Sequence, residues 1–195
     1  MTVDVRPYRG DDPDDRAGLW ALKRAFELGL GSGTGGEEKR ETYEGKLTDD
    51  YRERWLAWAD RCVEEDADCI VVAETGESGD GRDGGVGADE ADGAGGEDDA
   101  ADASGGDLVG YAFLLPESMA FVWDAAVLNE LFVAPEHRGT GLADDLMAAV
   151  LDAARDQTLP LDRLVLDVDR ENDRARAFYD RHGFEHWGEM VAREL

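Results

Sequence analysis

The residues with the clearest chemical potential form a short turn, Arg138-Gly139-Thr140-Gly141, between an apolar run and an amphipathic segment. Its two glycines permit positive φ angles and a close approach of the backbone to a ligand. A helix beginning at about Gly141 would direct its unpaired N–H groups, and the positive end of its dipole, at this turn. The turn therefore predicts an anion site suited to a phosphate or pyrophosphate.

An acidic residue lies within the apolar run before the turn. In a strand, alternation would place Glu130 and Phe132 on one face and Leu131 and Val133 on the other. A carboxylate among apolar groups holds its proton more tightly than one in water, which suits a base at neutral pH. Glu130 is therefore a candidate base, and an exposed strand position is the alternative.

A second group of residues follows at 172–184. Asn172 is a good helix N-cap, and Gly183 followed by Phe184 is typical of a left-handed C-cap with its apolar contact. Between these ends, Tyr179 lies on an apolar helix face. It is either a core tyrosine or a proton donor in a reaction.

The two segments together resemble the GNAT superfamily of acyl-CoA-dependent N-acetyltransferases. The first signature of that superfamily is a basic residue or glutamine, two variable positions, glycine, one variable position, and glycine or alanine. Arg138, Gly141 and Ala143 match it. The later pattern, N-x-x-A-x-x-F-Y-x-x-x-G-F, is matched without a gap at 172–184. The resemblance covers residues 108–195 well and the first 74 residues by pattern alone.

This resemblance implies an α/β fold with a central mixed, mostly antiparallel sheet flanked by helices and a parallel strand pair splayed around the acyl-CoA site. It implies acetyl-CoA as co-substrate and direct attack by a primary amine in a ternary complex. Glu130 would accept the amine proton, directly or through water, and Tyr179 would protonate the departing thiolate. The cofactor-binding positions that it implies are Leu131, Phe132, Val133, His137, Arg138, Gly139, Thr140, Gly141, Leu142, Ala143 and Asn172. For two of these positions an alternative role remains: His137 could be a surface residue, and Asn172 could serve only as a helix N-cap.

The elements that position these residues follow from hydrophobic periodicity. Strands are expected at about 3–6, 69–73, 108–115, 121–133 (with the motif strand at 126–133) and 163–168. Helices are expected at 17–28, 49–64, 141–156 and within 172–184, with a glycine loop at 30–36 and extended structure at 185–193.

We expect residues 1–195 to form a single N-acetyltransferase domain. Within it, residues 75–107 differ from the rest in composition. Of these 33 residues, eleven are glycine and eleven are acidic. Such a segment buries too little apolar surface to offset its ordering entropy. We expect a disordered acidic, glycine-rich insertion between two neighbouring strands.

The formal charge of −27 arises from 47 acidic and 20 basic residues. A halophilic source is the leading explanation for this acidity, and an acidic patch for a cationic partner is the alternative. Nucleic-acid binding is disfavoured because it needs a basic stripe. The N-terminus has no apolar segment typical of a signal peptide and no run is long enough for a membrane span, so we expect a cytoplasmic location without membrane attachment.

The cysteines and histidines do not predict a metal site. Cys62 and Cys69 indicate buried intracellular thiols rather than a disulfide. His182 and His186 are four residues apart, but Gly183 should end the helix between them and let the rings diverge. We therefore expect no metal.

The sequence is compatible with three functions. The first is an enzyme that acetylates a small-molecule or protein amine. The second is a non-catalytic acyl-CoA-binding and sensing module, and the third is an acidic interaction protein that uses the fold as a scaffold. The presence of both Glu130 and Tyr179 favours the enzyme. A homodimer is left open, and the acceptor amine is not predicted.

Overall fold

A computed structural model describes residues 2–33, 36–76, 107–188, 190, 191 and 193. Its centre is a five-stranded sheet in the order β1-β2-β3-β4-β5. The first four strands, β1 (Val3–Pro7), β2 (Ile70–Thr75), β3 (Leu108–Leu114) and β4 (Ala126–Val133), pair antiparallel. β5 (Leu164–Val165) pairs parallel to β4. The expected mixed, mostly antiparallel sheet with one parallel pair is confirmed.

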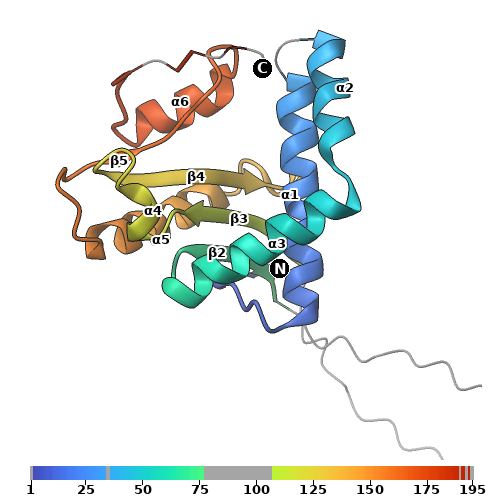
Figure 1. The fold of residues 1–195 in the computed structure, drawn as a ribbon, viewed down its shortest axis with the longest axis horizontal. Coiled ribbons are helices and arrows are strands. Elements are labelled where there is room, and N and C mark those ends of the chain that lie inside the picture. Colours follow the sequence, from blue (N-terminus) through green and yellow to red (C-terminus); the bar gives the residue numbers. More distant parts are fainter. Residues whose placement is uncertain (1, 34–35, 77–106, 189, 192, 194–195) are drawn as a thin grey trace, which may run out of the picture.

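Helices cover both faces of this sheet (Figure 1). On one face lie α1 (Pro13–Gly33), α3 (Asp49–Glu65) and, packed on α1, α2 (Gly36–Lys46). On the other face lies α5 (Leu142–Asp156), which contacts β1 to β4. The short α4 (Glu117–Ala120) precedes β4, and α6 (Asp173–Arg181) follows β5. No helix in the described ranges has the length and apolar character needed to cross a membrane.

Each face of the sheet has its own hydrophobic core. The α1–α3 side is rich in aromatic residues, including Trp55, Tyr111, Phe113 and Phe132. The α5 side is mainly aliphatic, and α6 packs against it through Phe178 and Tyr179. Cys62 and Cys69 are buried and free, as expected.

A bulge at Asn129 changes the face that β4 presents to each core. Phe113 of β3 pairs with Glu130, but the next residue, Leu114, pairs with Leu128. Asn129 is therefore an extra residue, and such bulges re-aim the side chains that follow them. Leu128 lies in the α5-side core, whereas Glu130 faces α1. Without the bulge, strand alternation would place both side chains on the same face.

Several expected boundaries are wrong. α1 continues to Gly33, so residues 30–33 are helical rather than part of a glycine loop, and α2 was not predicted. These two helices pack on each other, and this tertiary contact overrides weak local propensity. Residues 121–125 precede β4 as a turn, because its apolar residues do not alternate and Asp124 adopts a φ of 53°.

The C-terminal half also has less strand than expected. β5 has two residues instead of the predicted 163–168. Residues 185–188, where extended structure was expected, have no regular secondary structure. Residues 77–106 of the insertion lie outside the described residues. Its two ends are neighbours, since the Thr75 N–H donates to the Asp107 carbonyl at 3.0 Å. The insertion therefore connects adjacent antiparallel strands, as its position in the sequence predicts.

Candidate acyl-CoA site

The turn between β4 and α5 has the geometry expected of an anion site. A single 3₁₀ turn (Pro135–His137) follows the strand, and Gly139 and Gly141 then adopt φ angles of 80° and 95°. The Thr140 hydroxyl donates to the His137 carbonyl at 2.7 Å, which braces the turn. A Cβ on either glycine would meet no atom within 4 Å, so it is the backbone conformation rather than crowding that requires glycine.

The donors of this turn are left available for a ligand. The first backbone bonds of α5 run from the Asp144 and Asp145 N–H groups to the Gly141 carbonyl, at 2.8 and 3.2 Å. Within the described part of the chain, no backbone acceptor meets the N–H groups of residues 139–143. Leu142 and Ala143 open the helix, where N–H groups have no intrahelical partner. Five consecutive donors thus lie at the positive end of α5.

Arg138 turns back toward β4 rather than outward. Its Nε donates to the Val133 carbonyl at 2.9 Å, and its guanidinium lies 5.6 Å from the centre of the Phe132 ring. Burial, and the nearby positive charge of Arg174 from α6, lower the Arg138 pKa from its ordinary value. Arg174 is therefore a second cation near the turn. The sequence did not single it out, because it occupies a variable position of the 172–184 pattern.

β4 exposes one edge beside the turn. The Ala134 N–H donates to the Val109 carbonyl at 2.9 Å, which fixes the register with β3. In this register the backbone groups of Phe132 point toward β3, and those of Leu131 and Val133 point away from it. β5 pairs only with Ala126 and Val127, so the edge at residues 131–133 has no strand partner in the described sheet. Phe132 therefore differs from Leu131 and Val133, the other two expected cofactor-binding residues of β4. Its backbone groups pair with β3 and its side chain lies in the aromatic core.

Glu130 lies on the same face of β4 as the Phe132 side chain, buried beneath α1. Its Oε1 is 2.6 Å from the Lys23 Nζ, and its Oε2 accepts a hydrogen bond of 2.5 Å from the Tyr111 hydroxyl. The Asn129 amide also donates to Oε1, at 3.2 Å. The sequence predicted mainly apolar neighbours for this carboxylate, and that expectation is wrong because a buried cation contacts it. The sequence missed Lys23, which is 107 positions away.

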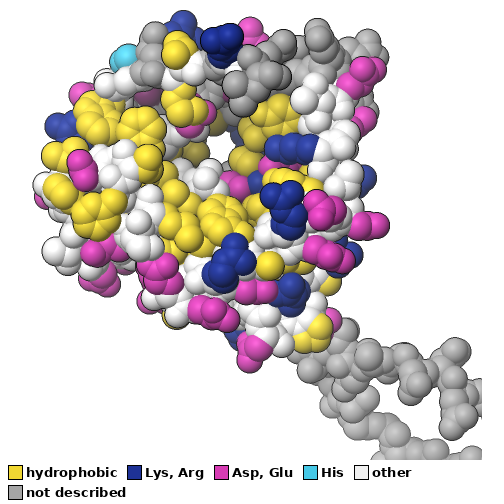
Figure 2. Space-filling model, in the orientation of Figure 1, with side chains coloured by type: hydrophobic (Ala, Val, Ile, Leu, Met, Phe, Trp, Pro, Cys, Tyr) yellow, Lys and Arg dark blue, Asp and Glu magenta, His cyan; other side chains and the backbone are white. Residues whose placement is uncertain are grey.

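Tyr179 lies on the α5-side core, between the rings of Phe178 and Phe184 at centroid distances of 5.4 and 5.5 Å. Burial raises the pKa of Tyr179 to about 12, so its hydroxyl keeps its proton at neutral pH. Figure 2 shows the surface hollowed between the α6 side and the α1–α2 side, with hydrophobic side chains around the opening and charged ones at its edge.

The ends of α6 are formed as the sequence predicts. The Asn172 side chain accepts from the Ala175 N–H at 3.1 Å, which confirms the N-cap. Gly183 is left-handed with a φ of 81°, and the Phe184 N–H donates back to the Tyr179 carbonyl at 3.1 Å. The His182 ring contacts Asp144 of α5 at 2.8 Å. Across the described residues, no group of three or more histidine, cysteine or acidic side chains is arranged to hold a metal.

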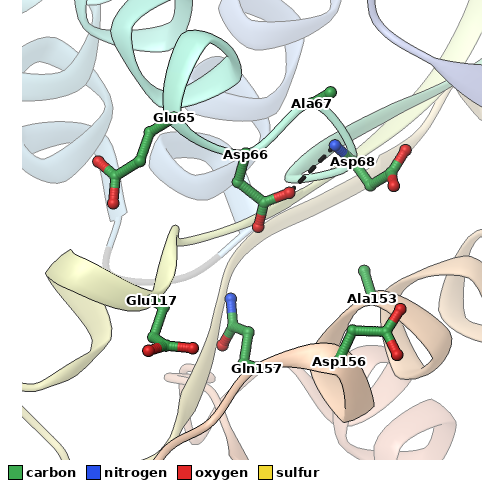
Figure 3. A pocket seen from close by; sticks show the side chains of 8 residues that line it. All are labelled: Glu65, Asp66, Ala67, Asp68, Glu117, Ala153, Asp156 and Gln157. Atoms are coloured by element: carbon green, nitrogen blue, oxygen red, sulfur yellow. Dashed lines mark hydrogen bonds between the residues drawn. The ribbon is translucent and has the colours of Figure 1, made fainter.

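A separate cavity of about 400 Å³ lies at the other end of α5 (Figure 3). Its polar lining is mostly acidic, with carboxylates from Glu65, Asp66, Asp68, Glu117 and Asp156. An anionic cofactor would be repelled there. The turn at residues 138–143 is therefore the better site for a pyrophosphate.

Comparisons with known proteins agree with this geometry. Residues 88–184, about half of the chain, match the acetyltransferase (GNAT) family. A 5-NmdU N-acetyltransferase of Pseudomonas phage PaMx11 is 40% identical over 68 residues, which are 35% of this chain and 45% of that protein. The similarity thus spans under half the length of this curated relative.

Two solved structures share the fold over nearly their whole length. PaiA N-acetyltransferase from Thermoplasma acidophilum, in complex with coenzyme A, is 18% identical with a TM-score of 0.62, over 95% of this chain and 91% of that one. AAC(6')-Iy, in complex with the bisubstrate analogue CoA-S-monomethyl-acetylneamine, is 15% identical with a TM-score of 0.60, over 100% and 99%. The chain has the fold of the GNAT acetyltransferases, and its residues 88–184 carry the sequence pattern of that family.

Proposed function

We propose that this protein is an acetyl-CoA-dependent N-acetyltransferase that acts on a primary amine by direct attack in a ternary complex. The observation that carries the proposal is the combination of two sets of backbone groups. The groups of Leu131 and Val133 point outward from the free edge of β4, and the five N–H groups at residues 139–143 have no backbone acceptor among the described residues. This length of backbone suits an extended ligand with an anionic end, as coenzyme A is.

The residues of this chain fit such a ligand. Pyrophosphate would lie on the N–H groups of 139–143, with Arg138 and Arg174 as nearby cations. Pantetheine would follow the outward groups of Leu131 and Val133, which requires Arg138 to release the Val133 carbonyl. His137 and Asn172 flank the turn and the start of α6, and their contacts with the cofactor are also part of the proposal.

In the proposed reaction, acetyl-CoA supplies a thioester that is open to attack by an amine. Glu130 accepts a proton from the acceptor ammonium, directly or through water. The free amine then forms the new C–N bond to the acetyl carbon as the C–S bond breaks, and an outward N–H of β4 stabilises the oxyanion. Tyr179 gives its proton to the departing thiolate, and the second proton, which the nitrogen loses as the amide forms, returns to the tyrosinate directly or through water. Alignment of the two reactants contributes several kcal/mol to the rate enhancement.

The proposed acceptor is a small-molecule or protein amine. The names of the similar proteins give different acceptors, 5-NmdU in one and an aminoglycoside in another. In this chain, Trp20 and Tyr51 of α1 and α3 pack partly buried beside the aromatic core, with their ring centres 6.2 Å apart. They are the side chains that we propose for the acceptor side.

A non-catalytic acyl-CoA sensor is the second candidate, and one observation favours it. Both carboxylate oxygens of Glu130 already have protein partners, which would hinder proton transfer from an amine. Acetyl-CoA with a panel of amines and peptides, in molar KCl, separates the two functions by release of free CoA thiol. An enzyme releases thiol only when an acceptor is present and yields an acetylated product. A sensor binds acetyl-CoA and releases none.

We also propose that the protein works in the cytoplasm of a halophile. Acidic side chains are spread over the surface in Figure 2, and the formal charge is −27. Salt screens the mutual repulsion of such charges. The melting temperature should therefore rise steeply between about 0.1 and 1 M KCl, the range over which the Debye length falls from about 10 to 3 Å. A flat dependence on salt would contradict this proposal.

A further inference from the structure

Lys23 of α1 is a buried cation held between two acidic side chains. Its side chain is only 4% exposed, and its Nζ lies 2.6 Å from Glu27 Oε1 and 2.6 Å from Glu130 Oε1. The rings of Phe26 and Trp55 lie 5.3 and 5.2 Å from the same nitrogen. The ammonium is therefore surrounded by carboxylates and aromatic faces, both of which favour a positive charge.

This lysine stays charged despite its burial. Burial alone would lower the pKa of Lys23, but Glu130 and Glu27 outweigh burial and raise it above its ordinary value. Glu27 is stabilised as an anion in turn. Burial opposes this, yet Lys23 and Lys46 lower the Glu27 pKa. The row Glu130, Lys23, Glu27, Lys46 thus alternates in charge from β4 through α1 to α2.

The choice of lysine is informative in this chain. There are three lysines against seventeen arginines, and the two lysines whose side chains are described both bind Glu27. A lysine ammonium is a compact point charge that fits between two carboxylates, whereas a guanidinium is a wide planar fork. In this arginine-rich chain, a lysine therefore occupies the position where a small cation contacts both Glu27 and Glu130 in a confined space.

We propose that Lys23 is a positioning residue for the candidate base: its ammonium bridges Glu27 and Glu130 and holds the Glu130 carboxylate fixed toward the acceptor side. This inference rests on the proposed function. It adds that the base depends on α1, the helix that covers the acceptor side, and that Glu27 anchors the bridge. The bulge at Asn129 turns Glu130 toward α1, and Lys23 contacts it there.

Other groups also face Glu130. Tyr111 of β3 donates to it, Glu27 of α1 lies across Lys23, and the Tyr51 hydroxyl of α3 donates to Glu27 Oε1 at 3.2 Å. Among the described residues, Lys23 is the one cation in contact with Glu130. A cation at this distance favours the ionised carboxylate. Its removal should therefore move the acidic limb of the rate profile to higher pH.

The test compares Lys23→Met with Lys46→Met. Both variants remove one lysine charge from Glu27, but Lys46 touches Glu27 Oε2 and not Glu130. Lys23→Met should lower kcat about 10- to 100-fold at neutral pH, as expected when a reacting group loses its position. Its acidic limb should move up in pH, and its affinity for acetyl-CoA should stay near the wild-type value. Lys46→Met should keep the wild-type pH profile.

A second variant keeps the test valid if Lys23→Met does not fold. Lys23→Met leaves Glu130 buried without a cation and Glu27 with Lys46 alone, so Lys23→Met with Glu27→Gln removes one charge of each sign. The double variant should fold and still show the upward shift of the acidic limb. An unchanged limb in the folded double variant would overturn the proposal, because Lys23 would then be a structural ion pair only.

A direct titration separates this inference from the proposed function. The carboxyl carbon of Glu130, labelled with ¹³C and assigned by Glu130→Gln, can be followed by NMR without turnover. If the wild-type protein acetylates no amine, the proposed enzyme is wrong, but the titration still decides the role of Lys23. Protonation of Glu130 at higher pH in the double variant supports that role, and an unchanged midpoint contradicts it.

Discussion

The Nε2 atom of His182 lies 2.8 Å from Oδ1 of Asp144, which joins the end of α6 to the first turn of α5. Arg181 contacts the same oxygen at 2.5 Å. Burial would raise the Asp144 pKa, but Arg181 and His182 outweigh it and lower the pKa. α6 carries Tyr179 and α5 begins at the proposed pyrophosphate site, so this contact connects the two halves of the proposed cofactor site.

Asp144→Asn should loosen α6 and remove a negative charge beside the pyrophosphate site. We expect kcat to fall about threefold to tenfold and the Kd for acetyl-CoA to stay equal or decrease, since loss of a transition-state contact lowers kcat without weakening binding. Asp145→Asn is the matched control, because it removes the same charge one residue later, on an exposed side chain. Steady-state kinetics and calorimetry on both variants check this. Equal effects in the two would show that charge alone matters.

The lowered Asp144 pKa also sets a pH dependence. A depressed carboxyl pKa stabilises the folded state above the ordinary aspartate value of about 3.9, and this contribution is lost as the pH falls through the folded value. The melting temperature of the wild type should therefore exceed that of Asp144→Asn at pH 7, and this difference should shrink as the pH falls below the ordinary aspartate value of about 3.9. An advantage that persists at low pH would mean that the ion pair is not its source.

Gly141→Asp should abolish acetyl-CoA binding while the protein remains folded. The side chain would carry a negative charge into the N–H groups of residues 139–143, where an anion is expected to bind. Gly141→Ala is the control, because it imposes the same strain at a φ of 95° without the charge. Calorimetry should show measurable affinity for Gly141→Ala and none for Gly141→Asp. Wild-type affinity in a folded Gly141→Asp variant would refute the assignment.

Tyr179→Phe should separate chemistry from binding. The ring keeps its contacts with Phe178 and Phe184, and only the hydroxyl is lost. We expect kcat to fall by about 10²- to 10⁴-fold where thiolate departure limits the rate, with little change in acetyl-CoA affinity. Because the Tyr179 pKa is raised to about 12, this hydroxyl should cause no loss of rate up to about pH 10 in the wild type. Near-normal kcat in the variant would make Tyr179 a core residue only.

Residues 77–106 should be dispensable. Their replacement by a short Gly-Ser turn should preserve activity and melting temperature in high salt, because Thr75 and Asp107 are already hydrogen-bonded neighbours. A shorter connection also has a smaller closure entropy, by about 0.6 kcal/mol for each halving of its length. Thermal unfolding and turnover of the shortened chain check this. A large loss of either would show that the segment contributes to the fold or to the site.

The parts of the site that the sequence predicted are those determined by neighbouring residues in the chain. The left-handed glycines of the turn, the Asn172 cap and the Gly183 C-cap each depend on residues within a few positions of one another. The apolar face of α5 and the alternation of Glu130 with Leu131 are local as well. Such features are encoded by spacing, so one sequence is enough to find them.

The missed features depend on partners far along the chain. The bulge at Asn129 exists because β3 pairs on both sides of it, and Lys23 meets Glu130 across 107 positions. α2 has few apolar residues and is helical while packed on α1. β5 is short because its pairing with β4 ends at Val127. Spacing within one segment carries no signal for any of these.

The central claim is that acyl-CoA binds along the free edge of β4 and the turn that follows it. Titration of acetyl-CoA into ¹⁵N-labelled protein in molar KCl tests this claim most directly. We predict saturable chemical-shift changes that are largest at the amides of Leu131, Val133 and residues 139–143, and small at the acidic cavity around Asp66. Binding with its largest changes elsewhere, or no binding, would contradict the account.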